Sequence, residues 1–312
     1  MGTGYGFEMG QVHRLIADRG IEQARVLSAD KLDRKCIETA FAVMTDEQQR
    51  IGIMHAGFAM TALPHKEIPA TQWVRQGGNI KLLIESGTDS TLQPVGIPFG
   101  SIARMILLYL QTEAVKTRSR DIELGRSMNQ WLTSMGIDNG GKTYRLVREQ
   151  SRRLSMCRLT FYRETAAAIH VTNGSFVRDA ILPSREGEQL SLWREAVRLD
   201  EGFYQSLIDH PMPVRERAIR EISGRSMAID VYVWLAYRLH QLTKPTPISW
   251  AALFNQFGGG FTHQWHFKSK FKEPLALALA AYPEAQVTAD EAGLTLYPSP
   301  PSVTERRIAV QA

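Results

Sequence analysis

Two stretches of the chain are apolar on nearly every side of a helix, and each opens a similar series of predicted elements. These stretches are residues 98–115 and 227–242, and such a pattern is typical of a helix at the centre of a core. Each is followed by a short amphipathic helix, a glycine-rich turn, a basic helix and a β-hairpin. The recurrence predicts two domains of related architecture, although the spacings within the two series differ.

The first series predicts a short helix over 127–135, a turn at 138–141 and a basic helix that ends near Ser155. Two strands, 157–163 and 171–182, then form a hairpin. The short helix is expected to point four side chains inward: Met128, Trp131, Leu132 and Met135.

The second series predicts a short helix over 249–257, a turn at 258–260 and a basic helix over 263–282, which Pro274 should kink or restart. A hairpin formed by 286–288 and 294–297 follows. This order is that of a helix-turn-helix with a β-hairpin wing. We therefore predict an α+β, mainly helical fold with tandem winged-helix domains.

The remaining patterns set the expected boundaries. An amphipathic helix is predicted over 31–48, followed by short β-like runs at 51–54, 58–63 and 80–85. The polar stretch 183–189 is the expected linker. The predicted division is an N-terminal arm (1–30), a first winged-helix domain (31–185), a second winged-helix domain (190–300) and a flexible tail (301–312).

Composition supports this organisation. The chain has 312 residues, 44% of them hydrophobic, and a formal charge of +5, which is enough for two cores and favours a polyanionic partner. Cys36 and Cys157 lie outside any Cys/His cluster, so no metal, disulfide framework or cofactor is expected. No secretory signal is visible, and the longest apolar run, 105–110, is too short for a bilayer. We expect a cytoplasmic protein with no membrane contact.

A phosphate-loop pattern occurs at residues 136–143, which match G-x-x-x-x-G-K-[ST] letter for letter. A working phosphate loop follows a buried parallel strand, so that its amides point at the phosphates. Here an amphipathic helix is expected instead. We therefore interpret the segment as a turn where Lys142 and Thr143 bond a DNA phosphate. A nucleotide-dependent enzyme remains an alternative.

The basic helices carry the candidate DNA contacts. Arg145, Arg148 and Arg152 repeat at i, i+3 and i+7, and a second helix of this motif can place such side chains in the major groove. A merely solvated helix face is the alternative. The buried side of the first basic helix is expected to hold Tyr144, Val147 and Leu154. The predicted DNA-binding residues are Lys142, Thr143, Arg145, Arg148, Arg152, Arg153, His263, Gln264, His266, Lys268, Lys270 and Lys272.

Other chemistry is poorly supported by the sequence. In the second basic helix, Phe267 and Phe271 are expected in the core, and the pair His263 and His266 lacks a third metal ligand nearby. No G-x-S-x-G or H-E-x-x-H motif occurs, nor the His pair and Tyr of a DNA-nicking protein. We therefore expect no enzymatic activity and no catalytic residues.

A resemblance to the plasmid-encoded RepA replication proteins is carried by four segments: GIPFGSIARMILLYLQTEA, ELGRSMNQWLTSMGI, GGKTYRLVREQSRRLS and RSMAIDVYVWLAYRLH. The similarity extends from about residue 12 to residue 301. It implies binding of double-stranded DNA at repeated origin sequences, help in opening the origin, and recruitment of a host replication initiator and helicase. It also implies a homodimer that represses its own gene. A winged-helix transcriptional regulator without initiator activity is the alternative function.

Overall fold

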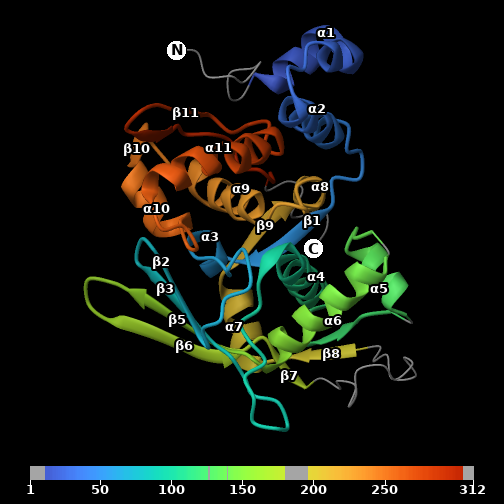
Figure 1. The fold of residues 1–312 in the computed structure, drawn as a ribbon, viewed down its shortest axis with the longest axis vertical. Helices are drawn as coiled ribbons and strands as arrows, with labels where there is room; N and C mark the ends of the chain where they lie inside the picture. The colour runs from blue at the N-terminus through green and yellow to red at the C-terminus, as the bar shows by residue number, and fades with distance from the viewer. Residues whose placement is uncertain (1–10, 126, 139, 180–195, 305–312) are drawn as a thin grey trace. The chain divides into compact units, whose positions relative to one another are not determined.

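The computed structural model describes residues 11–125, 127–138, 140–179 and 196–304. Two compact units are present. One is formed by Gly52–Met212, and the other by Met1–Ile51 together with Pro213–Ala312 (Figure 1). The chain passes from one unit to the other within strands β1 (Ile51–His55) and β9 (Pro211–Arg215).

The unit Gly52–Met212 contains a four-stranded antiparallel sheet in the order β2-β3-β5-β6 and a three-stranded sheet in the order β4-β8-β7. Helix α4 is the long apolar helix expected from the sequence, and ten of its residues are buried. It packs against α6, α7 and β4. The elements are α3 (Gly57–Met60), β2 (Gln72–Gly77), β3 (Ile80–Glu85), α4 (Gly100–Thr117), β4 (Asp121–Glu123), α5 (Met128–Ser134), α6 (Gly141–Met156), β5 (Arg158–Glu164), β6 (Ile169–Ser175), β7 (Val177–Asp179), β8 (Ala196–Leu199) and α7 (Glu201–Asp209).

The second unit is built around the other apolar helix, α9, which packs against α11. Its three-stranded sheet has the order β10-β12-β11. The elements are α1 (Val12–Val26), α2 (Lys31–Met44), α8 (Glu216–Glu221), α9 (Ser226–Arg238), the 3₁₀-helix η1 (Leu239–Gln241), β10 (Thr246–Ser249), α10 (Trp250–Phe257), α11 (Gln264–Ala280), β11 (Val287–Ala289) and β12 (Gly293–Leu296).

The expected recurrence of elements is present in both units. Helix α4 is followed by β4, α5, α6 and the β5–β6 hairpin, and helix α9 is followed by β10, α10, α11 and the β11–β12 hairpin. In the second unit β10 pairs with β12, so that the strand between the first two helices joins the hairpin in one sheet.

The division of the chain differs from the predicted one. Helix α2 was expected to open the first domain. It packs instead against α1, α8 and α11, in the unit formed by Met1–Ile51 and Pro213–Ala312. Residues 196–212, expected in the second domain, instead complete the unit Gly52–Met212, because β8 pairs with β4 and β7, and α7 packs on β6. These are contacts between distant segments, which a local pattern does not reveal. The expected linker 183–189 lies outside the described residues.

An N-terminal arm and a flexible C-terminal tail were expected, and the described parts of both are packed instead. Val12 and Ile16 of α1 are buried, and the His13 ring bonds the Ala280 carbonyl at 2.9 Å. Ser302 and Val303, expected in the tail, are buried as well. The predicted arm and tail are therefore wrong over residues 12–26 and 302–303, and residues 1–10 and 305–312 are not described.

Three local features differ from the sequence-based expectation. The apolar run 58–63 contains the short helix α3 instead of a strand, because so short a run does not distinguish helix from strand by periodicity. Strand β2 was not expected. Of the predicted kink or restart at Pro274, the restart does not occur: α11 is one helix through the proline, and Phe271 and Leu275 on either side of it are buried in the core.

Candidate nucleic-acid interface

Helix α6 presents a cationic face to solvent. Lys142, Arg145, Arg148 and Arg152 are all exposed. At 3.6 residues per turn their side chains leave the helix within about 120° of one another. Among the described residues, the side chains of Lys142, Arg145 and Arg148 have no hydrogen-bond or ion-pair partner. Three cations on this face are therefore available for an external ligand.

The opposite side of α6 fixes the helix in the unit. Val147 and Leu154 are buried as expected, whereas Tyr144 is half-buried and its hydroxyl donates to Asn129 of α5. Gln150 is buried, and its side-chain oxygen accepts a 2.8 Å bond from the Phe99 amide before α4. The four side chains that the spacing predicted to point inward are buried: Met128, Trp131 and Leu132 of α5, and Met135 directly after it.

Arg153 does not belong to the cationic face. Its side chain is 9% exposed and ion-pairs with Glu67 and with Glu149. The guanidinium also donates to the Ile97 carbonyl at 3.0 Å and lies over the Phe99 ring. Paired in this way, Arg153 is not available for the DNA contact predicted for it, because it lies one residue away from Arg152 and so on the packed side of the helix.

Another predicted contact, Thr143, lies in the first turn of α6. Thr143 is half-buried, and the N-cap Gly140 offers no side-chain bond to the first amides of the helix. The segment 136–143 connects α5 to α6, so the element before it is a helix, as the sequence indicated. The strand on which a phosphate loop depends is not there.

Helix α11 begins with a polar and aromatic surface. His263, Gln264, His266 and Lys270 are exposed, and Lys272 is half-buried. Lys268 is less available, since its ammonium bonds the Glu291 carboxylate at 2.8 Å and lies over the Trp250 ring. The core side of the helix holds the two residues expected there, Phe267 and Phe271.

Trp265 was not singled out by the sequence reasoning, yet 71% of it is exposed in the first turn of α11. Its ring stacks on His263 and lies tilted against His266. Helical spacing could have predicted this exposure. Phe267, Phe271 and Leu275 repeat at i, i+4 and i+8 on the buried face, and Trp265 does not lie on that face. An exposed indole beside two imidazoles can stack on or pack against a nucleic-acid base.

Metal and thiol chemistry find no site in the parts of the chain that the structure describes. In those ranges no three His, Cys, Asp or Glu side chains are grouped to hold a metal ion. Cys36 and Cys157 are buried and unpaired; burial raises the pKa of Cys36 to about 12 and raises that of Cys157 further. Neither thiol is reactive at neutral pH. None of the described helices combines the length and the apolar character needed to cross a membrane.

Comparison with known proteins gives one family and one fold. Residues 97–251, from α4 into α10, match the family model described as plasmid encoded RepA protein. A crystal structure of domains 2 and 3 of RctB, in selenomethionine form, matches with a TM-score of 0.50 and 12% identity over 80% of this chain and 99% of that chain. A second RctB structure of domains 2–3 has a TM-score of 0.46 and 11% identity over 76% and 93%. No curated protein sequence matches the chain.

Proposed function

Because the chain belongs to the family of plasmid-encoded RepA proteins, we propose that it initiates plasmid replication by binding repeated DNA sequences at the origin. The observation that carries the proposal is the exposed row of Lys142, Arg145 and Arg148 on α6, within the residues that match the family. Arginine can bond guanine O6 and N7 in a bidentate pair, while lysine neutralises phosphate.

We further propose that each recurring series of elements is a winged helix. In this interpretation α6 and α11 are the recognition helices, and the β5–β6 and β11–β12 hairpins are the wings. The pairing of β10 with β12 supports it for the second unit, because the strand after the first helix joins the wing strands. Two such modules on one chain would read successive major grooves of one site.

We propose that the two recognition helices make different contacts with DNA, one with base edges and the other with phosphates. Arg148 lies mid-helix on an open cationic face, so it is placed to reach a base edge. Lys270 is exposed and carries a flexible point charge, so it is better suited to phosphate. Arg152 contributes less, since it already ion-pairs with Asp89 at 3.2 Å.

In this proposal the protein acts in the cytoplasm and catalyses no reaction itself. It would help to open the origin, recruit a host replication initiator and helicase, and repress its own gene as a homodimer; the family membership supports these roles. Against a nucleotide-dependent enzyme stands the helix before residues 136–143. Lys142→Ala should weaken DNA binding, and an ATPase activity that this change abolishes would contradict the proposal.

Binding titrations on the full chain test the proposal directly. The duplexes are a repeat from DNA beside the gene and a scrambled sequence of equal length, over a series of salt concentrations. Arg148→Ala should cost about 1–3 kcal/mol on the repeat and relax the preference for it. Lys270→Ala should weaken both duplexes equally and lower the salt slope by about one unit.

Lys116→Ala, at the exposed end of α4, is the control for loss of a charge outside the interface. If Arg148→Ala and Lys116→Ala behave alike on both duplexes, α6 does not read the site. A plasmid that carries the origin but replicates without the protein would instead favour a transcriptional regulator of the same fold.

A further inference from the structure

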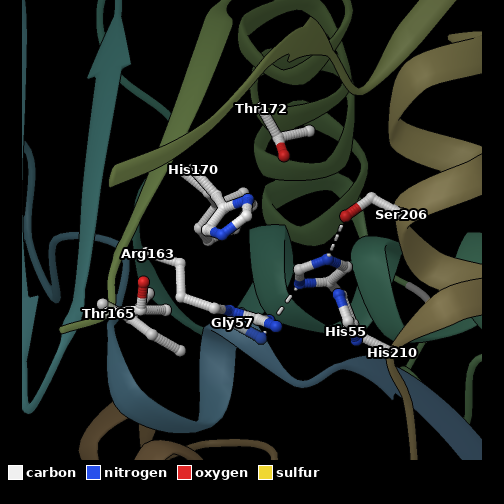
Figure 2. A pocket seen from close by; sticks show the side chains of 10 residues that line it. His55, Gly57, Arg163, Thr165, His170, Thr172, Ser206 and His210 are labelled. Carbon is white, nitrogen blue, oxygen red and sulfur yellow. Dashed lines mark hydrogen bonds between the residues drawn. The ribbon is translucent and has the colours of Figure 1, made fainter. Parts of the chain in front are cut away.

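A cavity of about 340 Å³ lies within the unit Gly52–Met212, and several of its lining residues are polar or charged. It is lined by residues of the β5–β6 hairpin, the end of β1 and helix α7. Figure 2 shows Arg163, His170 and Thr172 of the hairpin around one part of the cavity, and His55 with Ser206 around another. Segments that are far apart in the sequence therefore supply its walls.

Along the inner face of the hairpin, the side chains change from apolar to polar and charged. Leu159 and Phe161 of β5 are buried, and the next residue on the same face is Arg163. Across the ladder, His170 pairs with Arg163 and Thr172 pairs with Phe161. Since residues alternate between the two faces of a sheet and opposite residues share a face, a continuing core would place apolar side chains here. The chain instead places a guanidinium, an imidazole and a hydroxyl.

The buried imidazole of His55 is held in a defined tautomer. Its Nδ1 accepts a 2.9 Å bond from the Gly57 amide, so the ring hydrogen is on Nε2 and is donated to Ser206 Oγ, 2.8 Å away. Burial lowers the pKa of His55 to about 3, so the ring is neutral at pH 7. His55 therefore lacks a free lone pair to deprotonate Ser206, which argues against a hydrolase. Within the described ranges the Ser206 hydroxyl hydrogen has no acceptor, so it can donate to a ligand in the cavity.

The charge in the cavity is positive and uncompensated. In the described part of the chain, the guanidinium of Arg163 has no hydrogen-bond or ion-pair partner. Its charge helps to lower the pKa of His55 and of His210, in both cases after desolvation. The residues that line the cavity include no carboxylate. Asp209 beside His210 is exposed, and its carboxylate accepts a bond from Gln205.

We propose that this cavity binds a phosphate group, with Arg163 as the charged donor and Ser206, Thr172 and His170 as further hydrogen-bond donors. A guanidinium fits the oxygens of a tetrahedral phosphate in pairs, and charge-assisted bonds of this kind are the strong ones. The phosphate is either free, as inorganic phosphate or a nucleotide, or it belongs to a DNA backbone that follows the hairpin. Only the second source rests on the proposed function.

Thermal unfolding and calorimetry of the full chain test whether the cavity binds free phosphate. Inorganic phosphate is compared with chloride at matched ionic strength. Phosphate should raise the melting temperature of the wild type, and Arg163→Ala should weaken phosphate binding at least about tenfold. Arg158→Ala is the matched control, because Arg158 is exposed on the same strand but faces away from the cavity. If Arg163→Ala does not fold, Thr172→Val, which removes only a donor, takes its place.

Titration with non-specific duplex DNA tests whether the cavity binds a phosphate of a DNA backbone. If free phosphate does not bind, Arg163→Ala should still weaken the duplex more than Arg158→Ala and lower the salt slope by about one unit. The proposal is overturned if free phosphate does not bind and the two variants bind the duplex equally. Failure of the proposed function would appear separately, in the variants of α6 and α11.

Discussion

The guanidinium carbon of Arg153 lies 4.9 Å from the centre of the Phe99 ring, on the packed side of a helix whose other arginines face solvent. Arg153 also donates to the Ile97 carbonyl. Arg153→Ala should therefore lower the free energy of unfolding by about 1–3 kcal/mol, because a buried carbonyl loses its donor and a stacked cation is removed. Arg148→Ala should change it by less than about 0.5 kcal/mol.

Urea unfolding of both variants measures the difference. Equal stability of Arg153→Ala and wild type, together with weaker DNA binding, would return Arg153 to the DNA-binding surface and contradict the packing argument.

The division into units predicts which fragments fold. A fragment of residues 52–212 should unfold cooperatively, whereas a fragment of residues 31–185 should not, because it lacks β8 and α7. Phe203 and Leu207 of α7 are buried against the rest of the unit, and β8 joins β4 to β7. Circular dichroism melts of the two fragments decide between these boundaries, and a cooperative transition seen only for 31–185 would refute the observed division.

Stability should fall as the pH is lowered from about 6.5. Burial keeps the folded pKa of His55 near 3, below the ordinary value of 6.5, so the unfolded state binds more protons between these values and protonation favours unfolding. His13 and His65 are shifted in the same direction, also by burial. His55→Gln should reduce the slope between pH 6 and pH 5 by up to about 1.4 kcal/mol per pH unit.

Denaturant titrations of wild type and His55→Gln at a series of pH values measure this slope. An unchanged slope in the variant would show that His55 takes up its proton equally in the folded and unfolded states.

Trp265 should report DNA binding by fluorescence. Its indole is largely exposed in the first turn of α11, so contact with a duplex should change its emission by altering its solvent exposure and stacking. Trp265→Phe should remove most of the change. Trp73→Phe is the control, since Trp73 is half-buried in β2 and bonds the Ala62 carbonyl. A change that survives Trp265→Phe would place this turn outside the interface.

The recurring order of elements and the basic helices could be predicted from the sequence alone. Helices α4, α6, α9 and α11 lie close to their expected positions, because an apolar pattern that repeats over many residues determines a helix and its buried face locally. The same periodicity identified Arg145 and Arg148 as exposed. It also predicted that a helix, and not a strand, precedes the segment 136–143.

Only the tertiary structure decided the features that depend on contacts between distant segments. The place of α2 beside α11, the pairing of β8 with β4, and the burial of Arg153 by Glu67 and Phe99 join residues whose separation along the chain leaves no periodic signal. The cavity beneath the β5–β6 hairpin is of the same kind. Arg163 and Ser206 come together only because α7 packs on β6. The chemistry of each side chain determines what it can bind, whereas the fold determines which side chains share a site.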